Sequence, residues 1–446
     1  MSLVLLFLDT GSAPPPPPTP TVSQGVVQPQ PATPPTNRFG SSPRIHTRTE
    51  IQILDSNLDL ITTVIAPFPL TGGNIVQYSK ELSDYGQCTF RISSYDPQFA
   101  TFGDILQPHA NHVRIQRNNV TVWQGAIIEN PRRTKDYVQV VAAEYLWYLS
   151  KKLVHRTSID PATNTADGIY RIFNTANGAT TMAAAVTAIM NETIADYQST
   201  NHALASMTLG EIDNPNYPPN ITNAASPPAA LSGPWEFGDG TSAPSLTFDF
   251  HTILYILQQF GAYTYADFAI DNSRVFSFRS FLGNDLRDTV TLSWAENSDT
   301  VDFNLPRLGQ RMVNQLYGIA TDENGNVLHA QQSDQPSITT NGLLEGVAAY
   351  VDIKDQATLN ARVQAELPMI STPDGAATAV TVDERALTPG IVSVGDVVNQ
   401  SVQHRAVQYA QPRRVVGMTT VVYNTGHEET TIQLNKLLPF QPGGTS

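Results

Sequence analysis

Hydrophobic and polar residues alternate in short runs between residues 45 and 155. The segments "EIQIL" (50–54) and "CTFRIS" (88–93) have a period of two, which is typical of strands with one buried face. In "HVRIQRNNVTVWQG", Val113 and Ile115 share one face of a first strand, and two further valines share a face of a second. We predict a hairpin that turns at residues 117–119, because asparagine tolerates the left-handed backbone of a tight turn.

The same region ends in a strand that runs into a short helix. The segment "YVQVVAAEYLWYLSKKLV" begins with alternation and continues past Glu144 with Leu146, Leu149 and Leu153 along one side of a helix. Residues 45–155 therefore predict one mostly-β domain.

A mixed pattern follows, and it predicts an α+β middle domain at residues 156–299. The segment "TMAAAVTAIMNET" (181–193) has helical spacing, and "TFDFHTILYILQQFG" gives a second helix with a wide apolar face that should end at Gly261. A hairpin that turns at residues 271–274 comes next. Between the two helices, residues 214–234 form a Pro/Asn-rich loop of a length typical of functional or mobile segments.

Strand patterns return in the last region, residues 300–446. Asn324-Gly325 is the strongest short-range hairpin signal in the chain. A helix is expected over residues 356–367, closed by Pro368. The region should end in a long hairpin through residues 424–426, an Asn-Thr-Gly turn.

An internal repeat links the first and last regions. The dipeptide Gly103-Asp104 precedes Gly125 by 22 residues (125 − 103), and Gly395-Asp396 precedes Gly417 by the same 22 (417 − 395). Further strand patterns follow each of the later glycines at similar distances. Two copies so far apart argue against a solenoid or propeller, which need several repeats at short period. We therefore predict two copies of one β unit, which should superpose as sandwiches or barrels.

The chain begins with an apolar segment on a proline-rich spacer. Of the 32 prolines, 11 lie between residues 14 and 43, a composition that favours the extended polyproline II conformation. No Lys or Arg precedes Arg38, which argues against a signal peptide, and the apolar run is far shorter than the roughly 20 residues of a membrane-spanning helix. We predict no membrane anchor. The apolar residues of this segment are Leu3, Val4, Leu5, Leu6, Phe7 and Leu8.

Residues 1–44 are therefore interpreted as an arm whose first strand is carried by a stiff spacer. The spacer could reach on the order of 100 Å when extended. A disordered tail is the commoner fate of such termini. A compact apolar patch at the start needs burial, however, so we expect the arm to bury Leu3–Leu8 against another subunit.

Composition and charge restrict the chemistry. Hydrophobic residues make up 41% of the chain and charged residues 15%, and 26 basic against 40 acidic residues give a net charge of −14. This balance opposes direct phosphate binding. The single cysteine, Cys88, excludes an intrachain disulfide framework, and its strand pattern predicts a buried thiol that packs as a small hydrophobe.

No motif for catalysis or metal binding is complete. His109 and His112 lack a companion ligand set, and a surface loop is the preferred interpretation of this pair. The segment "DENGN" (322–326) resembles the start of a calcium loop but lacks its closing Glu, so it predicts a turn. Acidic pairs such as Glu296 and Asp302 leave a glycosidase dyad open as an alternative. We predict no enzyme, no catalytic residue, no cofactor and no intrinsic metal.

The order of these motifs resembles bacteriophage tail-tip and baseplate hub proteins. The residues that carry the resemblance are Gly103-Asp104 before a hairpin, the bend from Trp123 to Gly125, the strand and Leu-rich helix around residues 145–149, and the second β unit at 395–434. The resemblance covers about residues 45–155 and 290–438. It implies a mainly β (α+β) fold with two similar tube-like β-barrel or sandwich domains, at 45–155 and 300–446, which flank the mixed middle domain. The Pro-rich arm departs from the usual compact start of the family.

The resemblance implies a structural virion protein. Such a protein would be a homotrimeric hub at the distal end of a phage tail, made in the host cytoplasm. Its partners would be the tail tube and distal tail proteins, a central tip or fibre protein, the tape measure protein, and DNA that passes without specific binding. Two similar β domains in each of three chains would offer six similar surfaces to a hexameric tube and three to a trimeric tip.

A rival from another class is a secreted β-rich carbohydrate-binding or adhesin-like protein. The neutral Asn/Thr-rich composition favours it, and the absence of an export signal opposes it. The mass of the assembled particle separates the two, because a ring of this kind predicts three chains.

Overall fold

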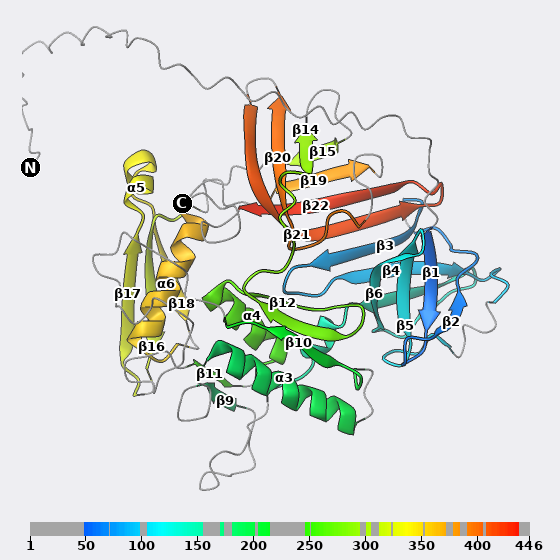
Figure 1. Cartoon of the computed structure of the whole chain (residues 1–446), viewed down its shortest axis with the longest axis horizontal. Helices are drawn as coiled ribbons and strands as arrows, with labels where there is room; N and C mark the ends of the chain where they lie inside the picture. Colours follow the sequence, from blue (N-terminus) through cyan, green and yellow to red (C-terminus); the bar gives the residue numbers. More distant parts are fainter. Residues whose placement is uncertain are drawn as a thin grey trace, which may run out of the picture. The chain divides into compact units, whose positions relative to one another are not determined.

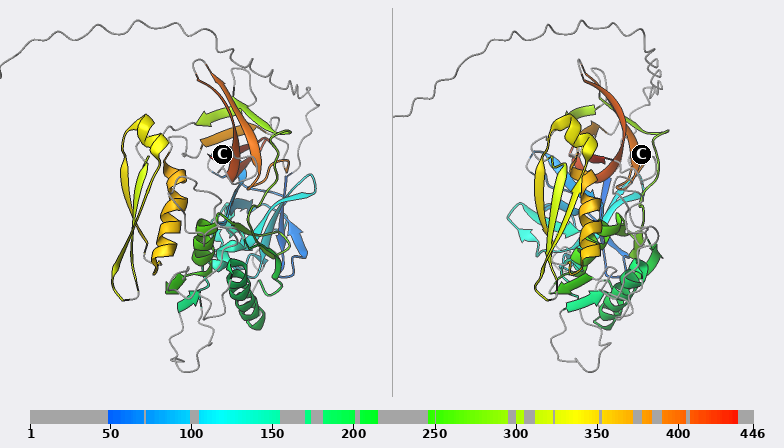
Figure 2. Two further views of the ribbon diagram at one scale, coloured as in Figure 1. Left: turned by 60° about the vertical axis from the view of Figure 1, so that its left-hand side comes forward. Right: turned by 90° about the vertical axis from the view of Figure 1, so that its left-hand side faces the viewer.

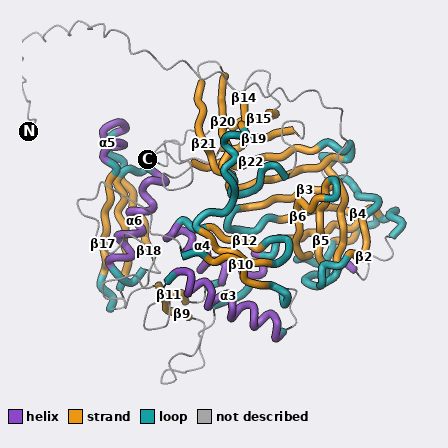
Figure 3. Tube along the Cα trace, in the orientation of Figure 1, coloured by secondary structure: helices purple, strands orange, loops and turns teal. Residues whose placement is uncertain are grey.

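The computed structural model describes residues 49–436, and the chain divides into two units, 1–45 and 46–446. Within 49–436 the description omits residues 71, 99–104, 155–169, 174–180, 201–203, 215–245, 250, 295–299, 305–311, 323, 351–352, 372–377, 384–389 and 405–406. The predicted arm, Gly103-Asp104, Glu296 and nearly all of the predicted 214–234 loop lie outside the described residues. Strands dominate the described part of the chain, so the predicted mainly β fold class is confirmed (Figure 3).

The first region is built almost entirely of strands (Figure 1). Ile51 and Ile53 are buried in the first strand, and Cys88, Phe90 and Ile92 alternate inward in the fourth, as their period-two patterns predicted. The elements are β1 (Thr49–Leu54), β2 (Leu60–Thr63), β3 (Asn74–Glu81), β4 (Gln87–Ser93), β5 (His112–Arg117), β6 (Val120–Ile127), β7 (Arg132–Arg133), β8 (Tyr137–Ala143) and α2 (Leu146–Leu149).

Two local predictions in this region are confirmed. The β5–β6 hairpin turns through Asn118 and Asn119, whose φ angles are 48° and 64°. Two successive left-handed residues are what a tight hairpin turn requires, and asparagine adopts them at low cost. Cys88 is fully buried, and burial raises the pKa of its thiol, so it behaves as a small hydrophobe.

The middle region combines two helices with short strands. Both helices begin at a threonine cap: Thr181 accepts a hydrogen bond from the amide of Ala184, and Thr252 accepts one from the amide of Tyr255. The hairpin predicted at 271–274 joins β12 and β13. The elements are β9 (Tyr170–Phe173), α3 (Met182–Ser199), β10 (Thr208–Ile212), β11 (Leu246–Asp249), α4 (Ile253–Thr264), β12 (Asp267–Ile270) and β13 (Val275–Arg279).

The predicted end of α4 at Gly261 is wrong. The helix continues to Thr264 and ends where Tyr265 takes a left-handed φ of 54°. A Cβ on Gly261 would lie 2.7 Å from the carbonyl oxygen of Ala266. The glycine is therefore needed for the close approach of the chain that leaves the helix, and it does not terminate the helix.

The last region returns to strands but includes a small α/β subdomain. Its elements are β14 (Thr291–Trp294), β15 (Thr300–Asn304), β16 (Gln315–Thr321), β17 (Val327–Ser333), α5 (Gln335–Asn341), β18 (Glu345–Tyr350), α6 (Gln356–Ile370), β19 (Thr378–Asp383), β20 (Val397–His404), β21 (Val407–Tyr423) and β22 (Glu428–Lys436). The hairpins predicted at Asn324-Gly325 and at residues 424–426 are both present.

The predicted stop of α6 before Pro368 is wrong by one turn. Pro368 lies inside the helix, which continues to Ile370, and the Ser371 amide donates to the Leu367 carbonyl at 2.9 Å. Proline has no amide to donate to the Gln364 carbonyl, so Pro368 costs the last turn one hydrogen bond but does not end the helix.

A single 14-stranded sheet joins the first and last regions. Its main path runs β15-β19-β22-β21-β3-β4-β8-β6-β5-β1-β2, and β3 pairs antiparallel with β21, with Ser79 opposite Thr419. The two regions that the sequence analysis separates thus share backbone hydrogen bonds. Three smaller sheets have the orders β10-β13-β12, β11-β9 and β17-β16-β18.

The two halves of this sheet contain similar three-strand meanders. Gly125 lies in β6, which pairs first with β5 and then with β8. Gly417 lies in β21, which pairs first with β20 and then with β22, and the register shifts between Val415 and Gly417. In both meanders the middle strand changes partner near the glycine. The superposition of the two β units, and the domain boundaries drawn from it, stay predictions.

Among the described residues, buried side chains form three clusters. One fills the first β region around Phe90 and Trp123, and a second lies beneath β21 and β22 around Val415 and Ile432. The largest runs through the middle region, around Phe260, and continues to the helix α6. The middle region and the small α/β subdomain therefore share one core.

Candidate functional surfaces

The sheet that joins the two β regions has one apolar and one polar face. Val76, Phe90, Val140 and Val422 are buried on the inner face and come from four adjacent strands. The alternate residues point to the other side and are mainly hydroxyl and amide side chains that keep partial exposure. They include Gln77, Ser79, Thr89, Gln139, Thr419, Thr431 and Gln433.

We name these outward residues of β22, β21, β3, β4 and β8 the polar face. Its rows cross the junction between the two regions: Thr431, Thr419 and Ser79 lie side by side, as do Gln77 and Thr89. The face is therefore continuous across the β3–β21 pairing.

The polar face holds few charges. Glu81 and Glu429 are its acidic members, and burial together with Asp84 raises the pKa of Glu81. Arg91 lies on this side of the sheet, with its guanidinium 4.3 Å from the ring centre of Tyr137 and its Nε donating to Gln139 at 3.1 Å. The exposed Arg132 of β7 lies opposite the same Gln139, and the buried Arg414 of β21, which pairs with Asp267, lies opposite Asn435. These cations are too few to form the extended row that neutralises a phosphate backbone.

A buried ion pair joins strands that are far apart in the sheet. Arg117 Nη1 of β5 lies 2.6 Å from Glu428 Oε2 of β22, and their side chains are only 4% and 1% exposed. The Thr49 hydroxyl donates to the other carboxylate oxygen at 2.7 Å. Five strands separate β22 from β5 along the sheet, so this contact requires the sheet to curve back toward itself, as it does in a barrel.

A second buried arginine connects the first region to the middle region. Arg274, in the β12–β13 turn, donates from Nη1 to Ser206 at 2.6 Å and from Nη2 to the Ser56 carbonyl at 2.7 Å. The same Nη2 lies 3.3 Å from His112 Nε2. Burial, and then the charge of Arg274, lower the pKa of His112 to about 3, so the imidazole is neutral and can accept this hydrogen bond.

The surface-loop interpretation holds for one histidine of the pair and is wrong for the other. His109 is exposed and stacks on Trp147 with ring centres 5.5 Å apart. His112 begins β5 and is fully buried. The short spacing suggested one loop for both residues. The strand β5 begins at His112, however, and its side chain points inward.

A third buried arginine explains the Gly-Asp motif in the last region. Arg414 pairs with Asp267 of β12 and donates to the carbonyls of Gly395 and Leu282 at 3.1 and 2.8 Å. The side chain of Asp396 accepts the amides of Asn284 and Ser393, each at 2.7 Å. Gly395 has a φ of 99°, and a Cβ there would lie 2.4 Å from the Leu282 oxygen. Through these hydrogen bonds the motif connects the last region to Leu282 and Asn284, which follow β13 of the middle region.

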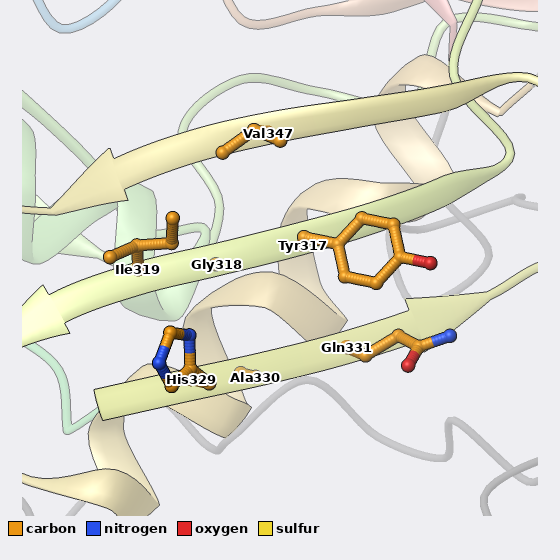
Figure 4. Close-up of a pocket in the computed structure, with 7 residues that line it drawn as sticks. All are labelled: Tyr317, Gly318, Ile319, His329, Ala330, Gln331 and Val347. Atoms are coloured by element: carbon orange, nitrogen blue, oxygen red, sulfur yellow. The ribbon is translucent and has the colours of Figure 1, made fainter. Parts of the chain in front are cut away.

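The small sheet β17-β16-β18 has one uncovered face. In both views of Figure 2, α6 lies along one side of this sheet, and its Leu359 and Val363 are buried there. On the other side Tyr317, Ile319, His329, Gln331 and Val347 line a shallow depression of about 560 Å³ (Figure 4). The sequence predicted the β16–β17 hairpin but gave no sign of an open face, because β18 follows only after α5.

Neither a metal-binding cluster nor a membrane-spanning helix occurs among the described residues. In that part of the chain, no group of three or more His, Cys, Asp or Glu side chains is placed to hold a metal ion. None of its helices has the length and apolar character needed to cross a membrane. Glu296 is not described, so the pair that it could form with Asp302 is not tested.

Neither a family model nor a curated protein sequence matches the chain. Solved structures do. A tail protein from Neisseria meningitidis MC58 is 9% identical, with a TM-score of 0.54, over 87% of this chain and 96% of that one. The 43 kDa tail protein of prophage MuSo2 from Shewanella oneidensis is 8% identical, with a TM-score of 0.55, over 87% and 98%.

A third similar structure is prophage tail protein gp18 from Listeria monocytogenes EGD-e. It is 13% identical, with a TM-score of 0.51, over 89% of this chain and 95% of that one. In all three comparisons the match spans nearly the whole of the other chain, so it includes the β regions together with the middle region. The fold of this chain is that of phage and prophage tail proteins.

Proposed function

We propose that this protein is a structural component of a phage or prophage tail, and that it acts as a trimeric hub at the distal end of the tail. The observation that carries the proposal is the polar face, which runs without a break across both β regions. The fold shared with three tail proteins supports the setting. The hub would join the tail tube and distal tail proteins to a central tip or fibre protein.

The sheet gives a physical reason for a hub. Each chain offers two β meanders in one sheet, and three chains would offer six. A ring of six similar edges matches a hexameric tube, while the threefold axis matches a trimeric tip. We infer that the chain converts one symmetry to the other without a second fold.

We further infer that the polar face lines the DNA channel. DNA passes quickly through a channel whose wall neither binds phosphates nor stacks on the bases. A face made mainly of hydroxyl and amide side chains satisfies both conditions, and Arg91 is already engaged by Tyr137 and Gln139. The tape measure protein would occupy the same channel before the DNA passes.

The proposal includes the N-terminal arm. Leu3, Val4, Leu5, Leu6, Phe7 and Leu8 would bury against another subunit, with residues 14–43 spanning the distance between them. Six apolar side chains left in water would forgo about 1.5–3 kcal/mol each. We expect the protein to act in the virion after synthesis in the host cytoplasm, and to have no enzymatic activity.

The mass of the purified protein in solution tests the proposal. Light scattering should give a particle of three chains, each of 48.5 kDa, at micromolar concentration. A stable monomer over the whole accessible range, together with glycan binding on an array, would support the adhesin-like alternative and overturn the hub.

A further inference from the structure

The strand β18 lies at an open edge of the small sheet. It pairs in parallel with β16 over six residues without a register shift, and no other described strand pairs with it. Strand edges of this kind present unpaired amides and carbonyls that accept another strand. In Figure 4 the side chain of Val347 stands on the same side of the sheet as those of Tyr317 and Ile319.

Four of the six residues of β18 are small or apolar, and the others are Glu345 and Tyr350. Ala348 and Ala349 have small side chains, while Val347 is 69% exposed and Leu343, just before the strand, is 53% exposed. Gly346 is closely covered, because a Cβ there would lie 2.8 Å from the Val313 side chain. An incoming strand with large apolar side chains would pack beside the two alanines. The opposite edge, β17, presents His329 and Gln331 on the open face and suits such a partner less well.

The small sheet is acidic, while the arm carries its positive charge 30 or more residues after the segment Leu3–Leu8. Residues 312–371, which hold this sheet and both of its helices, contain seven Asp or Glu and two Lys or Arg, a net charge of −5. Residues 1–48 contain Arg38, Arg44 and Arg48 against Asp9, a net charge of +2 in a chain of −14. The arm is thus the basic part of an acidic protein.

We propose that residues Leu3–Leu8 of one copy add as a strand to the free edge of β18 in a neighbouring copy. The inference rests on the arm being an inter-subunit strand, as proposed above, and it names the acceptor. Alternate side chains of the arm would pack beside Val347 on the open face, and the others would face α6. Six arm residues match the six residues Glu345–Tyr350.

Another exposed edge, that of β2, is a poorer acceptor. Leu60 and Ile61 are exposed there, but the strand has four residues and its pairing with β1 shifts register between Ile53 and Leu54. Such an irregularity breaks the even row of hydrogen bonds that strand addition extends. We therefore treat β2 as the competing outcome of the test.

Disulfide trapping tests the acceptor. In a Cys88→Ala background, chains that carry Leu3→Cys, Leu5→Cys or Phe7→Cys are mixed with differently tagged chains that carry Ala349→Cys. Adjacent strands lie about 4.8 Å apart, within reach of a disulfide. At least one arm position should form a disulfide with Ala349→Cys several-fold faster than with the matched control Gln331→Cys on β17.

The outcomes of this experiment distinguish two hypotheses: that β18 is the acceptor strand, and that the arm binds a neighbouring subunit at all. Trapping at Leu60→Cys, and not at Ala349→Cys, would keep the inter-subunit arm but overturn β18 as its acceptor. A disulfide that forms mainly within a chain carrying both cysteines would overturn the proposal, because the arm would then bind its own sheet. If deletion of residues 1–12 left assembly unchanged and no pair were trapped, both the acceptor and the assembly role of the arm would fail.

A charge substitution gives a second measurement in full-length protein. Val347→Arg places a cation beside the proposed strand and should weaken assembly to the level of the arm deletion. Val327→Arg, at a similarly exposed valine of β17, is the control and should assemble normally. Equal effects of both variants would contradict the assignment of the β18 edge.

Discussion

At the scale of single residues, the buried His112 should make stability depend on acidity. Its pKa of about 3 in the folded protein lies below the ordinary value of 6.5, so the unfolded chain binds the proton more tightly. The stabilisation is complete above pH 6.5 and is lost as the pH falls toward 3. Arg274 and Asp55 are the charged groups that face the ring, and the nearby phenol of Tyr145 packs on its edge.

We expect His112→Gln to flatten this dependence. Between pH 7 and pH 4 the free energy of unfolding of the parent protein should fall by roughly 3 kcal/mol more than that of the variant. Urea unfolding at several pH values measures the difference. The control is His109→Gln at the exposed histidine, which should keep the parent slope. Parallel curves for the parent and His112→Gln would show that the histidine is not the group that titrates.

Glu144 should act with the opposite sign. Burial raises its pKa to about 7, and its Oε2 accepts the Gly86 amide at 2.8 Å. The folded protein therefore holds this proton more tightly than the unfolded chain, and stability falls as the pH rises from 4.5 to 7. Glu144→Gln keeps the acceptor and removes the charge. At pH 8 it should stabilise the protein by roughly 2 kcal/mol, and at pH 5 by much less.

The exposed Glu129→Gln is the control for Glu144→Gln and should change stability little at either pH. A gain of equal size at pH 5 and pH 8 would mean that packing, and not ionisation, explains the effect. Neither His112 nor Glu144 could be assigned from sequence. Their partners Arg274 and Gly86 lie 162 and 58 positions away in the sequence, so no local pattern indicates either contact.

At the scale of elements, local patterns predicted strands and turns well and helix ends poorly. Period-two alternation located β1, β4 and the β5–β6 hairpin, because one buried face leaves a direct record in sequence. Gly261 and Pro368 both suggested helix stops that the structure does not have. Tertiary packing explains the glycine, because the chain after α4 passes close to Gly261. The helix α6 continues past Pro368 to Ile370.

The packing explanation for Gly261 can be tested by adding a methyl group. Intrinsic propensity alone predicts that Gly261→Ala stabilises a helix interior by about 1 kcal/mol. The Cβ would lie 2.7 Å from the Ala266 oxygen, so we expect a loss of about 1–3 kcal/mol instead. Thermal unfolding measures the sign. Gln259→Ala on the same helix serves as the control for propensity, and a raised melting temperature in Gly261→Ala would refute the close approach.

At the scale of the whole molecule, three buried arginines hold together regions that the sequence analysis treats as separate. Arg117 contacts Glu428, Arg274 contacts His112, and Arg414 contacts Asp267. Removing one partner of such a pair leaves a buried charge and is usually far more costly than any exposed ion pair. The sequence could not predict these partners, since each pair joins residues more than 140 positions apart. The shared sheet was missed for the same reason.

The proposed channel role leads to a prediction about DNA. If the polar face lines the channel, its small number of cations is what keeps passing DNA from binding. Gln77→Lys together with Thr419→Lys would place two cations on adjacent strands of this face, near the junction of the two β regions. Each phosphate contact adds about 0.9 to the slope of log affinity against log salt. We expect the assembled double variant to bind short duplex DNA at low salt and to release it by about 0.2 M salt, while the parent binds none.

The control, Val327→Lys with Val120→Lys, adds the same charge at exposed valines outside the polar face. Equal DNA binding by both variants would show that the polar face does not line the channel, because net charge alone would then explain the effect.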